Sequence, residues 1–144
     1  MSAILEHLHA SPPPAVHPRR RLLSDGATIA QLPLDPIRYL TVIVDSIAPL
    51  IANKSVSGIA GGGASVNVPV PLALRQRRRF AIRWIIDASD KRRDIKFETR
   101  VANELLAAAE GRSSAWEKKE LVYKLGVAGR VNVGKKPRKG SGGR

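Results

Sequence analysis

A strand-to-helix junction between Val68 and Arg93 places the strongest constraint on how this chain can fold. Pro69 and Pro71 lack backbone donors, so the strand either ends there or lies at a sheet edge. The residues that follow, about 74–90, show helical spacing of apolar side chains. The expected inward positions are Ala81, Trp84, Ile85 and Ala88. Such a helix buries one face in a core and leaves the opposite face free to meet a ligand.

The opposite face of this helix is rich in arginine, and no acidic residue interrupts residues 75–83. The whole chain carries a net charge of +13, from 25 Lys and Arg against 12 Asp and Glu. A protein this basic gains free energy by releasing counterions from nucleic acid. Guanidinium groups also bind phosphate through paired donors and stack on bases. We therefore expect RNA to be bound by Arg75, Arg77, Arg78, Arg79 and Arg83.

Further candidates for RNA binding lie elsewhere in the chain. A second basic group is Lys91, Arg92 and Arg93, where neighbouring aspartates leave ion pairing within the protein as an equal alternative. The hairpin, the last helix and the tail contribute Lys54, Ser55, Lys118, Lys119, Lys135, Lys136, Arg138 and Lys139.

The remaining pattern predicts a mainly α protein, a helical bundle with one protruding β-hairpin. Residues 2–10 are typical of the end of a helix, and the Pro-rich residues 11–35 predict a linker ordered on contact or a surface loop. Asp35 as N-cap and Pro36 as first residue start the next helix. Its expected inward positions are Leu40, Ile43, Val44, Ile47 and Leu50, and Pro49 should end it. The triple glycine at 61–63 predicts the turn of a hairpin that spans residues 53–72.

Two more helices are expected before a basic tail. One spans about 95–110 and stops at Gly111, with an inward stripe of Phe97, Val101, Leu105 and Ala108. The other begins with a capping box at residues 114–117 and weakens at Gly126 and Gly129. We expect three regions: 1–35 as helix end and loop, 36–125 as the RNA-binding domain, and 126–144 as a flexible basic tail.

The sequence gives little support to catalysis. Cysteine is absent, which excludes disulfides, thiolate metal ligands and a thiol nucleophile. His7, His9 and His17 all lie in the amino-terminal segment, where contact with solvent is the expected role. No Gly-rich phosphate loop is present, and no apolar run approaches the ~20 residues that cross a bilayer. We expect neither an enzyme, nor a cofactor or metal, nor a membrane span.

Several short segments, in order and with compatible spacing, resemble the small ribosomal subunit protein seven family. The resemblance covers about residues 37–125. The matching residues are 62–70, Arg77, Ala81, 82–85, Ala88, 91–92, 102–105, 108–111, Ala115 and 118–120.

This resemblance implies a helical bundle with a protruding hairpin that binds the 3′ major domain of small-subunit rRNA. The site would lie in the head near the exit site for tRNA, and family members support head assembly beside a protein of the family numbered eleven. The family's basic arm and first two helices precede anything in this chain except residues 2–10, so Met1 is expected to be internal to a longer protein. The Pro-rich insertion and the weakly charged hairpin are similar to fungal mitochondrial members, which predicts a mitochondrial ribosome rather than a bacterial or other organellar one.

The resemblance also makes exit-site tRNA or mRNA candidate partners near the hairpin. Two other classes remain open from the residues alone. One is a standalone architectural nucleic-acid-binding protein, which would prefer duplex DNA to structured RNA. The other is a hydrolase or nuclease, which would need clustered carboxylates or a histidine in the folded core.

Overall fold

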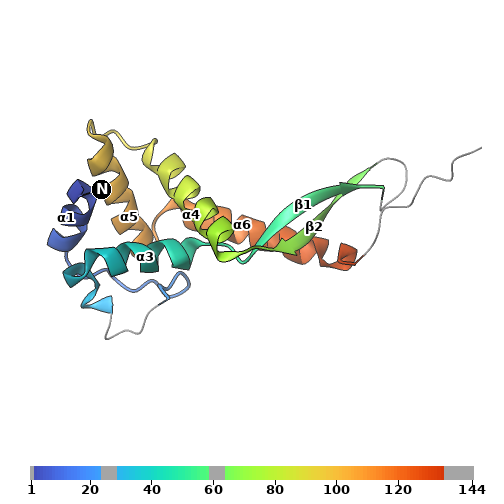
Figure 1. Ribbon diagram of the computed structural model, residues 1–144, viewed down its shortest axis with the longest axis horizontal. Coiled ribbons are helices and arrows are strands. Elements are labelled where there is room, and N and C mark those ends of the chain that lie inside the picture. The colour runs from blue at the N-terminus through green and yellow to red at the C-terminus, as the bar shows by residue number, and fades with distance from the viewer. Residues whose placement is uncertain (1, 24–28, 59–63, 135–144) are drawn as a thin grey trace, which may run out of the picture.

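The computed structural model describes residues 2–23, 29–58 and 64–134 of the chain, and these form a helical body from which one hairpin projects (Figure 1). Helices α1, α3, α4 and α5 make the body, and α6 runs from the body along the hairpin. The predicted mainly α architecture with a β-hairpin is confirmed. The described elements are α1 (Ser2–Ala10), η1 (Leu32–Leu34), α3 (Pro36–Ile47), β1 (Ile51–Ser57), β2 (Ser65–Pro71), α4 (Leu74–Ser89), α5 (Phe97–Ala109), α6 (Ser114–Gly129) and η2 (Arg130–Asn132).

One apolar core joins the helices of the body. Its fully buried side chains include Leu8 of α1, Ile43 and Ile47 of α3, Ala81 of α4 and Ala108 of α5. Full burial of each Leu or Ile side chain stabilises the folded state by about 1.5 to 3 kcal/mol. The sequence predicted these inward faces because their 3.6-residue spacing is regular.

Two expected core residues are exposed instead. Leu50 is 57% exposed because α3 ends at Ile47, so Leu50 lies beyond the regular helical turn. Phe97 is 49% exposed because it is the first residue of α5, at the rim of the body. Leu50 lies beyond the end of its helix and Phe97 at the very start of its own, and helical spacing does not show which side chains face the core at these positions.

The start of α3 follows the prediction. The Oδ1 atom of Asp35 accepts a hydrogen bond from the backbone N–H of Arg38 at 3.2 Å, and Pro36 is the first helical residue. The helix ends two residues before Pro49, whose ring cannot continue the hydrogen-bond ladder.

The N-cap of α6 is Ser113, not Ser114, and the predicted capping box is wrong by one residue. The hydroxyl of Ser113 accepts the backbone N–H of Ala115 at 3.2 Å and donates to the Oε1 atom of Glu104 at 2.5 Å. Ser113 is buried because the preceding turn, with Gly111 at a φ of 77°, brings it back against α5. The acidic partner thus comes from another helix, 9 residues earlier in the chain.

The hairpin is tied to α6 at its base. β1 and β2 pair antiparallel, and β2 continues through Pro69 to Pro71, which lie at an outer edge because the sheet has two strands. The side chain of Asn53 donates to the carbonyl of Val122 at 3.0 Å, and the hydroxyl of Tyr123 accepts the N–H of Leu50 at 3.0 Å. The triple glycine of the expected turn lies outside the described residues.

Two glycines of α6 allow the hairpin to lie against it. The helix does not weaken at Gly126 but continues to Gly129. A Cβ atom at Gly126 would come within 2.4 Å of the Cδ1 atom of Ile51, and one at Gly129 within 2.4 Å of the carbonyl oxygen of Asn67. We conclude that close approach of the two elements requires glycine at both positions, and Gly129 is also the last residue of the helix.

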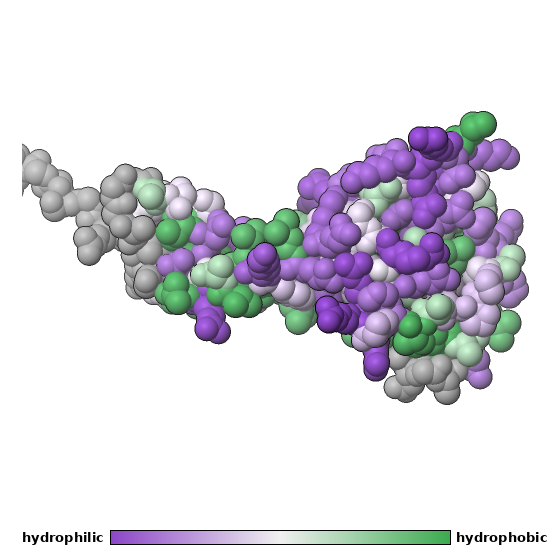
Figure 2. Space-filling model, turned by 180° about the vertical axis from the view of Figure 1, so that it is seen from behind, coloured by the Kyte–Doolittle hydropathy of each residue, from purple (hydrophilic) through white to green (hydrophobic). Residues whose placement is uncertain are grey.

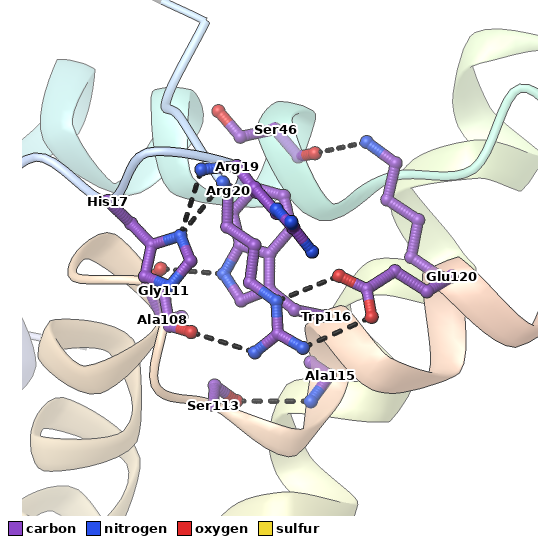
Figure 3. Close-up of polar contacts among 11 residues, drawn as sticks. His17, Arg19, Arg20, Ser46, Ala108, Gly111, Ser113, Ala115, Trp116 and Glu120 are labelled. Carbon is purple, nitrogen blue, oxygen red and sulfur yellow. Dashed lines mark hydrogen bonds and ion pairs between the residues drawn. The ribbon is translucent and has the colours of Figure 1, made fainter.

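The part of the Pro-rich segment around His17 and Arg20 lies against the turn between α5 and α6 (Figure 3). The guanidinium of Arg20 donates to both carboxylate oxygens of Glu120, at 2.8 and 3.1 Å, and to the carbonyl of Gly111 at 2.9 Å. These hydrogen bonds lower the pKa of Glu120 below its ordinary value. The Nδ1 atom of His17 accepts the backbone N–H groups of Arg19 and Arg20 at 3.1 and 3.0 Å. Most of the described residues of this segment are exposed, while Pro14 and Leu22 are buried.

Two absences hold for the described residues. No helix among them is long and apolar enough to cross a membrane. Among the same residues, no group of three or more His, Asp or Glu side chains is arranged to hold a metal ion.

Candidate nucleic-acid interface

Three arginines of α4 face outward, one turn apart, and we call Arg75, Arg79 and Arg83 the arginine row. All three are exposed, and among the described residues no acidic side chain lies within ion-pair distance of them. Their guanidinium groups therefore keep their donors for a ligand. Their spacing of four residues makes successive side chains neighbours on the helix surface.

The other two arginines of the expected cluster turn toward the protein. Arg78 forms a two-pronged ion pair with Asp45 of α3, with N–O distances of 2.7 and 2.9 Å. The hydrogen bond to that carboxylate, and its charge, raise the pKa of Arg78 above its ordinary value. The Nε atom of Arg77 donates to the carbonyl of Pro49 at 3.2 Å. Arg78 fixes α4 to α3 and Arg77 fixes it to the segment after α3. The structure therefore divides the cluster into arginines that bind within the protein and arginines that are free for a ligand.

A broad groove runs along the outer face of α4 beside the arginine row. Its volume is about 940 Å³, and Leu74, Ile82 and Ile86 give it an apolar side. Ile82 is 47% exposed and Leu74 51% exposed, so aliphatic surface lies next to the guanidinium groups. This combination suits a ligand with both anionic and apolar parts.

The lysines expected on α6 are engaged within the protein. Lys118 lies 3.5 Å from the carboxylate of Asp87 on α4. The Nζ atom of Lys119 donates to the carbonyl of Ser46 at 2.7 Å and sits 5.4 Å from the ring centre of Trp116. Burial, and secondarily the charge of a nearby arginine, lower the pKa of Lys119. Both lysines connect α6 to the helical body.

The second basic group is divided in the same way. Arg92 pairs with Glu104 of α5 at 2.8 Å and donates to the carbonyl of Asn103 at 3.3 Å. Its partner is thus Glu104 rather than one of the aspartates that follow or precede it in sequence. Lys91 and Arg93 are exposed and form no ion pair with any residue the structure describes.

The two hairpin residues expected to bind RNA, Lys54 and Ser55, are both exposed. Lys54 lies opposite Val68 and Ser55 opposite Asn67 in the antiparallel register. Seen from behind, hydrophilic residues cover most of this face of the helical body, while hydrophobic ones are interspersed along the narrower part (Figure 2). The expected tail residues Lys135, Lys136, Arg138 and Lys139 lie outside the described residues.

Sequence reasoning assigned no role to two further cations, Arg19 and Arg21. Both are exposed on the segment that Arg20 pins to Glu120. The run of three arginines at 19–21 was the sequence feature that could have indicated this surface. The surrounding prolines and the lack of periodicity gave no indication that Arg20 holds the segment against the protein.

The chain is similar to known proteins along most of its length. The family model described as "Ribosomal protein S7p/S5e" matches residues 16–130. Small ribosomal subunit protein uS7m of Neurospora crassa is 46% identical over 138 residues, which covers 92% of this chain and 45% of that relative. Small ribosomal subunit protein uS7 is 38% identical in Granulibacter bethesdensis and 37% in Ectopseudomonas mendocina, each over 67% of this chain and 60% of the relative. The chain therefore spans about half the length of the curated relatives it matches, and it belongs to the ribosomal protein S7p/S5e family.

Proposed function

We propose that this chain is a structural, RNA-binding constituent of the small subunit of the mitochondrial ribosome, with no catalytic role. The observation that carries the proposal is the arginine row, three exposed guanidinium groups without an acidic partner among the described residues. Membership of the family and the likeness to uS7m of Neurospora crassa support the ribosomal and mitochondrial assignment.

The proposed mechanism is phosphate binding by a preorganised surface. α4 is fixed by Arg78 on Asp45 and by Asp87 on Lys118, so the helix that carries the arginine row does not have to be ordered when RNA arrives. Phosphate contacts of this kind set the position of RNA and stabilise its tertiary structure, and they read little sequence.

The proposed binding site on the RNA is the 3′ major domain of the small-subunit rRNA, in the head. There the chain would support head assembly next to a protein of the family numbered eleven, with the hairpin near exit-site tRNA or mRNA. Residues 36–125 would be the RNA-binding domain. The exposed Lys91 and Arg93, Lys54 and Ser55 on the hairpin, and the basic tail would add contacts beyond the arginine row.

Co-sedimentation tests the ribosomal assignment. A tagged copy, expressed in the cells the chain comes from, should sediment with small subunits from purified mitochondria and stay bound after a high-salt wash. Recovery only with cytosolic ribosomes or with another organelle's ribosomes would reject the compartment.

A competition assay tests the RNA class. The 3′ major domain transcript should displace labelled RNA from the protein far better than duplex DNA of equal phosphate number. Preference for duplex DNA would instead support a standalone architectural protein.

A further inference from the structure

A pocket with a volume of about 330 Å³ lies on the other side of the arginine row, between the base of the hairpin and α4. This volume is near the lower end of the range, roughly 300 to 1,000 Å³, of pockets that hold small organic groups. The residues that line it are Ala52 of β1, Leu72 of the connecting segment, and Gln76, Arg79, Phe80 and Arg83 of α4. It therefore shares two guanidinium groups with the arginine row.

The walls of this pocket are held in place by other contacts. Phe80 is half-buried and packs on Trp84, with ring centres 5.9 Å apart and planes tilted by 47°. The N–H of Leu72 donates to the carbonyl of Leu50 at 3.1 Å, which continues the strand pairing toward α4. The side-chain oxygen of Gln76 accepts the N–H of Ala73 at 3.2 Å, and this leaves the amide NH₂ group as a donor. Phe80, Leu72 and Gln76 are thus positioned by contacts within the protein.

The chemistry of these walls matches one part of an RNA chain. An aromatic ring with aliphatic neighbours suits the flat face of a base, because every base can stack and water is excluded. An amide donor suits a carbonyl on the edge of a base. Two arginines at the rim suit the phosphates on either side, since guanidinium groups bind phosphate through paired donors. The acidic side chains of a peptide would pair with the arginines, but they would not stack on the ring of Phe80.

We propose that this pocket receives one unstacked nucleobase of single-stranded RNA, with Phe80 as the stacking wall and Arg79 and Arg83 on the flanking phosphates. The amide of Gln76 donates to the edge of the base. This inference rests on the proposed RNA-binding function and adds a base-recognition site to a surface that otherwise contacts phosphate alone. It explains why an aromatic residue stands at the base of the hairpin beside exposed arginines.

Two probes of equal charge test the proposal with the full chain. One is a short oligouridylate, and the other is an abasic ribose-phosphate chain of the same length. One stacked base should give a preference of about 5- to 150-fold for the base-bearing chain at fixed salt. Equal binding of the two chains by the wild-type protein would overturn the inference.

Substitutions assign the preference to the pocket. Phe80→Leu keeps an apolar side chain against Trp84 but removes the aromatic face, so the preference should disappear while the salt dependence of binding stays. Phe80→Tyr should retain the preference, and Phe97→Leu, which changes an exposed aromatic residue of α5, should leave it unchanged. Thermal unfolding of each variant checks that the fold is intact.

The outcomes separate this inference from the proposed function. If Phe80→Leu keeps the preference, or if Phe97→Leu also abolishes it, the pocket is not the base site. If an acidic peptide displaces the oligouridylate more strongly than the abasic chain does, the pocket belongs to a protein partner. If the wild-type protein binds neither chain nor the rRNA transcript in a salt-dependent way, the proposed function itself fails.

Discussion

Removing the arginine row should flatten the salt dependence of RNA binding without unfolding the protein. The perturbation is the triple variant Arg75→Gln, Arg79→Gln and Arg83→Gln. The three side chains are exposed and carry no ion pair within the described structure, so the free energy of unfolding should change by less than about 0.5 kcal/mol for each.

The expected size of the effect follows from counterion release. Each phosphate contact contributes about 0.7 to 0.9 to the slope of log K against log salt, so three contacts contribute about 2 to 3. Between about 50 and 200 mM salt, the wild-type protein should lose roughly 20- to 40-fold more affinity than the variant. At low salt the variant should bind RNA more weakly than the wild-type protein, because it no longer gains the free energy of releasing the counterions that the arginine row displaces.

The assay is a filter-binding titration of the 3′ major domain transcript at several salt concentrations. A matched control removes three exposed cations from other parts of the chain, through Arg38→Gln, Lys96→Gln and Lys124→Gln, and lowers the net charge equally. If the row variant keeps the wild-type slope, or if the control flattens the slope as much, the row does not bind phosphate and only net charge matters.

Three further substitutions test the packing that supports this surface. Gly111→Ala should cost about 1 to 3 kcal/mol in urea unfolding, because φ is 77° and the new Cβ atom would lie 2.7 Å from the ring of His17. Ser113→Ala should destabilise by about 1 kcal/mol or more while Ser114→Ala has little effect, and equal losses would contradict the assigned cap. Burial raises the pKa of Tyr39 from 10.0 to about 12, so the unfolded state loses its proton first and stability falls as pH rises between these values. Tyr39→Phe should therefore reduce this alkaline loss in denaturant titrations at successive pH values, and an unchanged profile would reject the cause.

Local signals predicted most of the fold because they act within one or two helical turns. Asp35 and Pro36 mark the start of α3 by a hydrogen bond and a fixed φ that depend on adjacent residues alone. The hairpin follows from alternation and glycine, and the end of α5 from Gly111. The features that were predicted wrongly from the sequence depend on contacts between residues far apart in the chain. Gly126 looked like a break in α6, but its missing side chain makes room for Ile51, 75 positions earlier in the chain.

The candidate site shows the same division between local and distant information. Helical spacing placed the α4 arginines correctly on one stretch of helix, but it could not tell a free guanidinium from a paired one. That distinction depends on Asp45, which is 33 residues away from Arg78. For Arg92 the sequence left RNA and a neighbouring aspartate as equal alternatives, but its carboxylate partner is Glu104, 12 residues on, because the α4–α5 turn brings that side chain back.

The polar contacts that fix α4 also explain why the arginine row is suited to binding a rigid RNA surface. Arg77 donates to the carbonyl of Pro49, Arg78 holds Asp45, and Asp87 meets Lys118, so α4 is fixed to α3 and to α6 through polar contacts near both of its ends. None of these contacts uses a donor of the arginine row. Since ordering each long side chain or mobile segment costs about 0.5 to 1.5 kcal/mol on binding, a helix already fixed by its neighbours lowers that cost. Arg78→Gln should therefore weaken RNA binding mainly by loosening α4, with the salt slope nearly unchanged, whereas loss of the row changes the slope itself.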